Sequence, residues 1–472
     1  MRKTKIVCTI GPATNSKEKI TQIIQAGMNV ARLNFSHGTY EDHKNVINII
    51  RRISKKLNKP VAILQDLQGP KLRVGKIKNG SVFLKTGSKI TIVIKNIFGD
   101  EQNISTTYKE LAKDVNVDDA ILLDDGLICL KVDQTKDDSV ICTIEEGGIL
   151  TDFKGINLPG VNISQPSFTK KDRKDLLFGI RQGVDLIALS FVRNSDDILH
   201  AKNIITENKK DILVIAKIEK PEAIINLKNI IEAADGAMIA RGDLGVELPL
   251  EKIPVLQKKI IRLCQEKGKP VITATQMLES MRKYSRPTRA EVSDVANAIF
   301  DGTDAVMLSA ETATGYFPIE TVKTMDKIIR EAEKTIVKNF THQLHPQGRT
   351  QTIADAVANS ACEAANILKV KAIVTFTYSG FTARMVAKYR PNINIFALTP
   401  SEIVQHQLSL SWGVTSLKMD YIESIDEIIK QTELLLLKNS VVKKGDEIVI
   451  LLGMPIFAKG TTNLMKIHVI GG

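Results

Sequence analysis

Acidic and basic side chains end two apolar runs in the middle of the chain. Lys217 and Glu219 stand two residues apart in LVIAKIE, and Asp243 follows the glycine that ends GAMIARG. Residues two apart on a strand point to the same side. Two carboxylates without a histidine form a hard oxygen site that suits Mg²⁺ or Mn²⁺ bound together with substrate oxygens. With the Lys217 cation, they predict a site that neutralises charge on a phosphoryl group in transfer.

Residues near two other runs predict contacts with an anionic substrate. Arg32, in ARLNFSHG, carries a planar donor fork that can grip a phosphate. Asn34 and Ser36 alternate beyond it, and Asp66 lies at the end of the next run. The structural alternative is that Asp66 only pairs with Arg32.

A carboxylate on the substrate has predicted partners as well. The backbone N–H groups of Gly242 and Asp243 and the hydroxyl of Thr275 can hold it. Alternatively, Thr275 caps the helix that follows, and the Lys217–Glu219 pair only fills a layer inside a barrel. The shared position of all these residues at the ends of apolar runs favours one common site.

Eight apolar runs must position these residues. The runs begin at residues 5, 29, 60, 185, 213, 236, 270 and 305, and they close at Thr9, Asn34, Asp66, Ser190, Glu219, Gly242, Thr275 and Glu311. They are rich in Val, Ile and Ala without strict alternation, as parallel strands buried on both faces are. Amphipathic helical stretches separate most of them. The pattern predicts an α/β fold, a (β/α)8 TIM barrel with its chemistry at the C-terminal ends of the strands.

Two further units are expected outside the barrel. An excess of about 90 residues after the third run alternates apolar and polar residues and carries the hairpin turn Asp125-Gly126. After a linker at 341–352, helix and strand patterns alternate again. We therefore predict a catalytic barrel at 1–69 and 167–340, an inserted small β-barrel lid domain at 70–166, and a C-terminal α/β domain for regulation or assembly at 350–472.

Composition excludes several classes of function. The chain has 472 residues and a net charge of +12, but no arginine-rich arm or basic stripe with aromatic residues, so no nucleic acid partner is expected. Five cysteines without CxxC spacing disfavour disulfides and zinc. No apolar run reaches the roughly 18 residues that span a membrane, and no signal peptide is recognised. A cytoplasmic enzyme without a membrane partner is predicted.

The sequence resembles the pyruvate kinase family over nearly its whole length. The resemblance rests on ARLNFSHG, LQDLQGPKLR, KGINLPG, AKIEKPE, MIARGDLGVELP, VITATQMLESM, RPTRAEVSDVANAIFDGTDAVMLSAETA and GTTNLMKIHVI. It implies a phosphotransferase that moves the phosphoryl group of phosphoenolpyruvate to ADP under Mg²⁺, giving pyruvate and ATP in the last step of glycolysis. It also implies the three-part architecture and, usually, a homotetramer.

The resemblance also implies roles for individual residues. Arg32 would contact the substrate phosphate, Lys217 would stabilise the transition state, and Thr275 would help protonate the enolate through water. The remaining assignments are Glu219 and Asp243 as metal ligands; Gly242, Asp243 and Thr275 on the substrate carboxylate; Arg73, Lys154 and Asn34, with His37 and Tyr40 as secondary residues, near the nucleotide; and Asn34, Ser36, Asp66 and Leu67 in the monovalent-cation pocket.

The chain departs from the common family pattern in that cation pocket. Leu67 has no side-chain oxygen, and Lys71 replaces a glutamate. An ammonium group there can supply the charge that K⁺ supplies elsewhere, and the family includes a lysine-bearing branch that is independent of K⁺. We therefore predict catalysis that does not require K⁺.

A C-terminal loop predicts a phosphate cradle. Thr377, Ser379, Gly380 and Thr382 lie between a predicted strand and a helix N-terminus. In allosteric family members the equivalent loop binds a sugar phosphate or a nucleotide such as AMP. Phe381 stands where a basic residue is often found, so a purely structural helix cap is the alternative.

Two other functions are compatible with parts of the sequence. One is an Mg²⁺-dependent TIM-barrel lyase or aldolase acting on pyruvate-like acids, which shares the metal carboxylates but does not need a lid or residues for a nucleotide. The other is a non-catalytic basic scaffold, which gives no reason for acidic residues at the strand ends.

Overall fold

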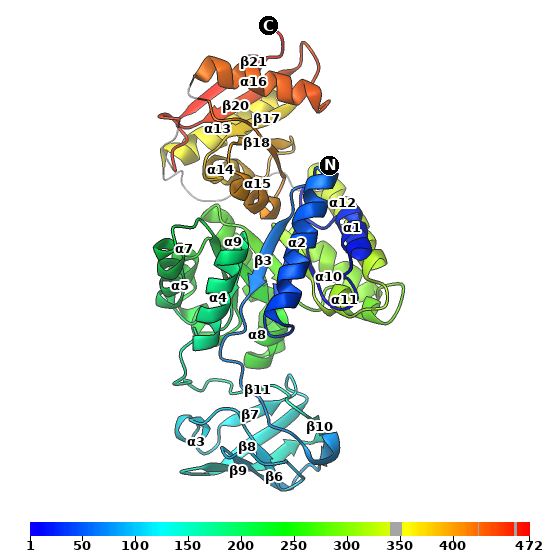
Figure 1. Ribbon diagram of the computed structural model, residues 1–472, viewed down its shortest axis with the longest axis vertical. Coiled ribbons are helices and arrows are strands. Elements are labelled where there is room, and N and C mark those ends of the chain that lie inside the picture. The colour runs from blue at the N-terminus through cyan, green and yellow to red at the C-terminus, as the bar shows by residue number, and fades with distance from the viewer. Residues whose placement is uncertain (340–351, 423, 457–459) are drawn as a thin grey trace.

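The computed structural model describes residues 1–339, 352–422, 424–456 and 460–472. Three units follow one another along the long axis of the molecule (Figure 1). The inserted β unit lies at one end, the barrel in the middle and the C-terminal unit at the other end. The predicted linker lies outside the described residues except for Thr352, which caps the first C-terminal helix.

Eight parallel strands close into a barrel in the order β1-β16-β15-β14-β13-β12-β3-β2. The strands are β1 Lys5–Thr9, β2 Val30–Asn34, β3 Ala62–Asp66, β12 Leu186–Leu189, β13 Leu213–Ile218, β14 Gly236–Ala240, β15 Val271–Ala274 and β16 Ala305–Leu308. Alternate residues fill two cores: Val7, Leu64 and Ile272 pack inside the barrel, and Ile63 and Ile239 pack under the helices. The predicted (β/α)8 fold is confirmed.

The barrel strands are surrounded by helices, five of which begin at side-chain caps. The helices are α1 Lys17–Ala26, α2 Tyr40–Leu57, α4 Lys170–Gln182, α5 Ser195–Glu207, α6 Pro221–Ile225, α7 Leu227–Ala233, α8 Arg241–Glu247, α9 Ile253–Glu266, α10 Arg289–Phe300, α11 Ala310–Ala313 and α12 Pro318–Asn339. Ser16 caps α1, and Thr39, Thr169, Asn194 and Thr288 form capping boxes at α2, α4, α5 and α10. These caps fix where the chain turns from a strand end into the next helix.

The inserted unit is built from strands between β3 and α4. Its elements are β4 Ser81–Leu84, β5 Lys89–Val93, β6 Asn103–Ser105, α3 Leu111–Asp114, β7 Ala120–Leu123, β8 Ile128–Lys136, β9 Ser139–Glu146, β10 Gly148–Thr151 and β11 Ile156–Asn157. They form a six-stranded sheet, β11-β7-β8-β9-β5-β6, and a two-stranded sheet, β10-β4. The predicted turn at Asp125-Gly126 joins β7 to β8, with both residues at positive φ. The unit has its own apolar core.

The C-terminal unit packs on the N-terminal ends of the barrel strands. It contains α13 Ile353–Leu368, β17 Ala372–Phe376, α14 Phe381–Lys388, β18 Ile395–Thr399, α15 Glu402–Gln407, β19 Val414–Lys418, α16 Ile425–Lys438, β20 Glu447–Leu452 and β21 Leu464–Val469. Its sheet has the order β19-β18-β17-β20-β21, with β21 antiparallel. Lys5 Nζ donates to the Val414 carbonyl at 2.7 Å, and Arg390 pairs with Asp304 at 3.0 Å. No helix of the described chain is both long and apolar enough to cross a bilayer.

Lys5 makes stability depend on pH at this junction. Burial, with a smaller contribution from the charge of Arg2, lowers the pKa of Lys5 from 10.5 to about 7. Between these two values the unfolded chain binds more protons than the native protein, so native stability rises with pH across that window. We expect Lys5→Met to reduce the rise in the midpoint of thermal unfolding between about pH 7 and about pH 9.5, measured by calorimetry.

The exposed Lys19 provides the control, because Lys19→Met leaves the buried amine in place. A pH dependence that is the same in Lys5→Met and in the wild-type protein would contradict this account.

Candidate active site

Lys217 lies at the centre of a buried network at the C-terminal ends of β13, β12 and β3. Its Nζ lies 2.8 Å from Glu219 Oε1 and 3.2 Å from Asp66 Oδ1. It also donates a hydrogen bond to Ser190 Oγ at 2.7 Å. Lys217 and Glu219 therefore face the same side, as their spacing predicts.

Arg32 joins this network through Asp66. Its Nε and Nη2 each lie 2.7 Å from Asp66 Oδ2, and its Nη1 donates to Thr9 Oγ1 at 3.0 Å. Because Asp66 also contacts Lys217, the alternative in which it pairs with Arg32 alone is wrong. Asp66 holds two cations at fixed positions on neighbouring parts of the rim.

The network keeps its groups charged despite burial. Burial alone would lower the pKa of Lys217, but the carboxylates of Asp66 and Glu219 raise that pKa above its ordinary value. Burial acts in the opposite sense on Asp66, yet Lys217 and Arg32 hold its pKa below the usual range. Lys217 therefore remains an ammonium ion at neutral pH.

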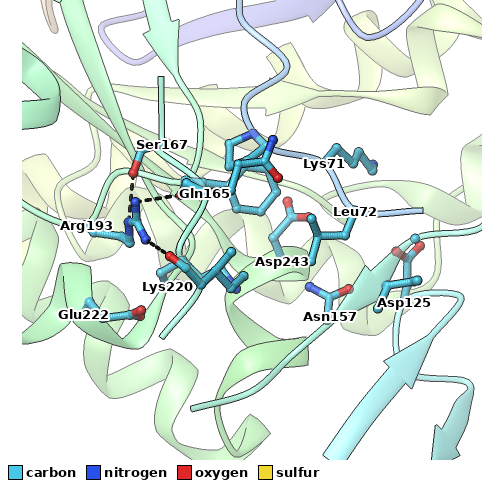
Figure 2. A pocket seen from close by; sticks show the side chains of 15 residues that line it. Lys71, Leu72, Asp125, Asn157, Gln165, Ser167, Arg193, Lys220, Glu222 and Asp243 are labelled. Atoms are coloured by element: carbon cyan, nitrogen blue, oxygen red, sulfur yellow. Dashed lines mark hydrogen bonds between the residues drawn. The ribbon is translucent and has the colours of Figure 1, made fainter. Parts of the chain in front are cut away.

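Glu219 and Asp243 form the predicted pair of carboxylates. Burial raises the pKa of Glu219, and the charge of Asp243 raises it further, although Lys217 opposes both. Glu219 also accepts the Phe191 N–H at 2.8 Å. Within the described chain, the Asp243 carboxylate has no hydrogen bond or ion pair, and it faces a cleft (Figure 2).

This pair fits a divalent cation. The charge of Asp243 makes ionisation of Glu219 less favourable, and a cation bound between the two carboxylates would offset that repulsion. The described residues hold no cluster of three or more His, Cys, Asp or Glu side chains suited to a metal. An ion here would therefore take its remaining ligands from substrate and water, as the sequence analysis expects.

Thr275 and Gly242 lie together, but they bind each other. Gly242 N–H donates to Thr275 Oγ1 at 2.7 Å, and this hydroxyl donates to the Ala274 carbonyl at 2.6 Å. Thr275 thus contacts the start of α8, and the structural alternative, in which it caps the following helix, is wrong. A substrate carboxylate would have to share or take over the Gly242 N–H.

Arg241 holds this turn and was not recognised in the sequence. Its Nη2 donates to the Thr275 carbonyl at 2.8 Å, and its guanidinium makes two bonds of 2.7 Å to Asp294. Thr275 has φ 67°. This left-handed conformation is costly for a β-branched residue, and the bond from Arg241 helps to maintain it. The available signal was the arginine directly before Gly242.

A cleft separates the inserted unit from the barrel rim (Figure 2). Lys71, Leu72, Asp125 and Asn157 line it on the side of the inserted unit, and Phe191, Arg193, Lys220 and Asp243 line it on the side of the barrel. The predicted metal ligand Asp243 therefore opens onto space that both units enclose.

Glu247 connects the two sides of this cleft. Its Oε1 accepts hydrogen bonds from Lys220 Nζ at 2.6 Å and from Asn157 Nδ2 at 3.0 Å. Its Oε2 is buried without a partner among the described residues. Sequence reasoning missed this contact, although Lys220 directly follows Glu219 and Glu247 lies one helical turn after Asp243.

The residues expected near a nucleotide are only partly brought together. Arg73 donates to the Phe153 carbonyl at 2.8 Å, and Lys154 pairs with Asp124 at 2.7 Å. His37 lies near Arg73: burial lowers the pKa of His37, and the charges of Arg73, Lys71 and Arg32 lower it further.

Tyr40 belongs to a different set of contacts. Its hydroxyl donates to Asp175 at 2.6 Å, and its ring stacks on Phe178 with a centroid distance of 4.6 Å. Both partners lie on α4, so these contacts anchor α2 to α4.

Most residues of the predicted cation pocket contact other groups of the protein. Asn34 Oδ1 accepts the Ser36 N–H at 3.1 Å. The side chain of Leu67 is buried in the apolar core. Lys71 is exposed, and no hydrogen bond or ion pair of its side chain occurs in the described chain. The cations in contact with Asp66 are Lys217 and Arg32.

The C-terminal loop has the predicted position. Thr377 and Ser379 lie between β17 and α14, and Gly380 has φ 78° at the start of the helix, without a side-chain cap. Thr382 is already engaged, because its hydroxyl lies 2.8 Å from the Thr462 hydroxyl. The Thr382 hydroxyl is therefore less available to a ligand than the backbone N–H groups at the start of α14.

Comparison with known proteins agrees with this architecture. The family model described as "Pyruvate kinase, barrel domain" matches residues 1–322, and "Pyruvate kinase, alpha/beta domain" matches residues 355–468. A pyruvate kinase of Geobacillus stearothermophilus is 49% identical over 99% of this chain and 80% of its own, and one of Sporosarcina psychrophila is 48% identical over 100% and 81%. A crystal structure of a pyruvate kinase from Cryptosporidium parvum superposes with a TM-score of 0.93 at 39% identity, covering 99% of this chain and 96% of that one. The chain belongs to the pyruvate kinase family.

Proposed function

We propose that this protein is a pyruvate kinase that transfers the phosphoryl group of phosphoenolpyruvate to ADP. The observation that carries the proposal is the Lys217 ammonium, held 2.8 Å from Glu219 at the rim where Asp243 faces the cleft. A cation beside a pair of carboxylates can stabilise charge on a transferring phosphoryl group. Membership of the family and the match over the whole chain support the same reaction.

Each residue at the rim has a proposed task. Arg32 and Lys217 bind the phosphoryl oxygens, and Asp66 orients both cations. Glu219 and Asp243 would hold Mg²⁺ or Mn²⁺, which would supply Lewis-acid stabilisation of charge on substrate oxygens. Gly242, Asp243 and Thr275 hold the substrate carboxylate; Arg73 and Lys154, with His37, contact the nucleotide.

A coupled assay tests the activity directly. With phosphoenolpyruvate, ADP and Mg²⁺, we expect ATP and pyruvate to appear in equal amounts. Pyruvate without ATP would instead indicate the lyase or aldolase alternative. The absence of both products would favour the non-catalytic scaffold.

We propose that K⁺ is not required. Lys71 adds a positive charge to the cleft wall, where it acts together with Arg32 and Arg73. Initial rates in sodium-free Tris with and without KCl should differ by less than about tenfold, which corresponds to about 1.4 kcal/mol in the barrier. Lys71→Glu should make the rate depend on KCl, and Lys78→Glu in the inserted unit is the control. Strong activation of the wild-type enzyme by KCl would contradict the proposal.

We propose that the inserted unit, 70–166, closes over the nucleotide and that Glu247 sets its closed position. Glu247→Gln leaves Lys220 buried without a countercharge and weakens the contact to Asn157. We expect the KM for ADP to rise by about tenfold, while the KM for phosphoenolpyruvate changes little. Initial rates at varied concentrations of each substrate measure both constants.

Asn157→Leu removes the same contact from the lid side and should act in the same direction. Equal changes in the two KM values would show that Glu247 does not act through the lid.

We also propose that the protein is a homotetramer in the cytoplasm. The loop of Thr377, Ser379, Gly380 and Thr382 is the proposed effector site for a sugar phosphate or AMP, supported by its position at the N-terminus of α14.

A further inference from the structure

Basic side chains line a cavity between the barrel and the C-terminal unit. Lys269 comes from the loop between α9 and β15, and Arg384, Lys388 and Arg390 come from α14 and the residues after it. One carboxylate, Asp304, lines the same cavity. The cavity is shallow and open to solvent, so an anion bound by these side chains would lie at its mouth.

Two of these cations have a carboxylate partner. Arg390 pairs with Asp304 at 3.0 Å, and Lys388 pairs with Asp355 at 2.6 Å. Even so, Arg390 Nε is buried without a hydrogen-bond partner among the described residues. The protein therefore does not satisfy every donor at this cavity.

Lys269 and Arg384 have no ion pair in the described chain. The Lys269 ammonium donates to three backbone carbonyls at the end of α7, at 2.5–2.7 Å. Arg384 donates a single hydrogen bond, to the Ser379 carbonyl at 3.3 Å. Asp235 acts on both charges from beyond ion-pair distance.

Burial makes these unpaired charges costly. It lowers the pKa of Lys269 to about 8 and lowers the pKa of Arg384. Arg384 is half-buried and uses one of its donors on a carbonyl, so its desolvation is only partly offset by a partner. A planar fork with free donors matches a phosphate or sulfate group.

We propose that this cavity binds a small dianion, either inorganic phosphate or the phosphoryl group of a phosphate monoester, with Arg384 as its main donor. The dianion would balance the charges of Arg384 and Lys269 and join α14 to the barrel. The site lies at the N-terminal end of the barrel strands, opposite the catalytic cleft. It adjoins the loop before α14, because the Arg384 guanidinium packs against Gly380 and donates to the Ser379 carbonyl.

Calorimetric titration with inorganic phosphate tests the proposal without using catalysis. Every protein carries Arg32→Gln, which weakens phosphate binding at the catalytic rim, and only binding that changes when Arg384 is replaced is assigned to the cavity. We expect saturable binding, weakened about tenfold or more by Arg384→Gln and less by Arg384→Lys. Arg262→Gln, at an exposed arginine on α9, should bind phosphate as the parent does. A parallel titration with glycerol 3-phosphate separates a free anion from a monoester.

Thermal unfolding distinguishes a ligand site from a structural arginine. Phosphate, compared with chloride at equal ionic strength, should raise the unfolding midpoint of the parent but not that of Arg384→Met. In phosphate-free buffer, Arg384→Met should be at least as stable as the parent, because it removes a half-buried charge that has no carboxylate partner in the described chain. The proposal would be overturned if neither phosphate nor glycerol 3-phosphate bound to the parent. Equal phosphate affinity in the parent and in Arg384→Gln would also overturn it.

Discussion

Lys217→Met is expected to lower kcat by at least about 10³-fold, because it removes the cation nearest to the transferring phosphoryl group. Methionine keeps the length of the side chain but cannot carry a charge. The ammonium makes two ion pairs, to Asp66 and Glu219, so no neighbouring lysine can take its place. Arg32 remains on Asp66, and we therefore expect the KM for phosphoenolpyruvate to change less than kcat.

The same substitution should also affect stability. Without Lys217, two buried carboxylates lose a countercharge, and removal of one partner from a buried pair costs about 3–5 kcal/mol. Mg²⁺ bound at Glu219 would offset part of this loss. We expect Lys217→Met to unfold at a lower temperature than wild type in EDTA and to recover partly when Mg²⁺ is added.

Lys202→Met is the matched control for Lys217→Met. Lys202 is also partly buried and pairs with one carboxylate, Asp235, but away from the rim. It should lose some stability and keep nearly full kcat. Near-normal turnover in Lys217→Met, with the far-ultraviolet circular dichroism of wild type, would exclude a catalytic role for this lysine.

The barrel and the main charged residues were predictable from the sequence for physical reasons. Parallel strands buried on both faces need continuous apolar runs, and the barrel brings all their C-terminal ends to one rim. Once the runs are placed, the spacing of Lys217 and Glu219 fixes their common direction. The ion pair between them follows from local chemistry.

Contacts that depend on turn conformation or on distant segments were not predictable. Nothing in the sequence shows that Thr275 adopts positive φ, because β-branched residues rarely do. Its hydroxyl consequently points to Gly242 and not to the next helix. The contact between Asn157 and Glu247 joins residues 90 apart in the chain, from two separate units. Pattern and spacing carry no information at that range.

Lys71 shows the same limit in the cation pocket. Its type suggests a substitute for K⁺, but its placement depends on the loop that leads into the inserted unit. The side chain is exposed on the cleft wall, whereas Arg32 and Lys217 contact Asp66. If Lys71 replaces K⁺, its positive charge acts on bound ligands through the electrostatic potential of the cleft and not through a direct contact with Asp66.

Asp243→Asn should increase the Mg²⁺ concentration for half-maximal activity by about 10- to 100-fold, a change of the size seen when a metal site loses part of its support. The amide has nearly the same shape but no charge. Because Asp243 contributes to the raised pKa of Glu219, its loss also makes Glu219 easier to ionise. Easier ionisation of Glu219 favours Mg²⁺ binding, so it partly offsets the loss of the Asp243 charge and limits the rise in the Mg²⁺ concentration for half-maximal activity.

Stability provides a readout that does not depend on turnover. In EDTA, Asp243→Asn should be at least as stable as wild type, because two neighbouring carboxylates no longer repel each other. Added Mg²⁺ should raise the unfolding midpoint of wild type by selective binding to the native state, and raise that of Asp243→Asn much less. Glu222→Gln is the control, since Glu222 lines the same cleft. If wild type and Asp243→Asn respond to Mg²⁺ equally in both measurements, the metal does not lie between Glu219 and Asp243, and the pairing of Lys217 with Glu219 is then no part of a metal site.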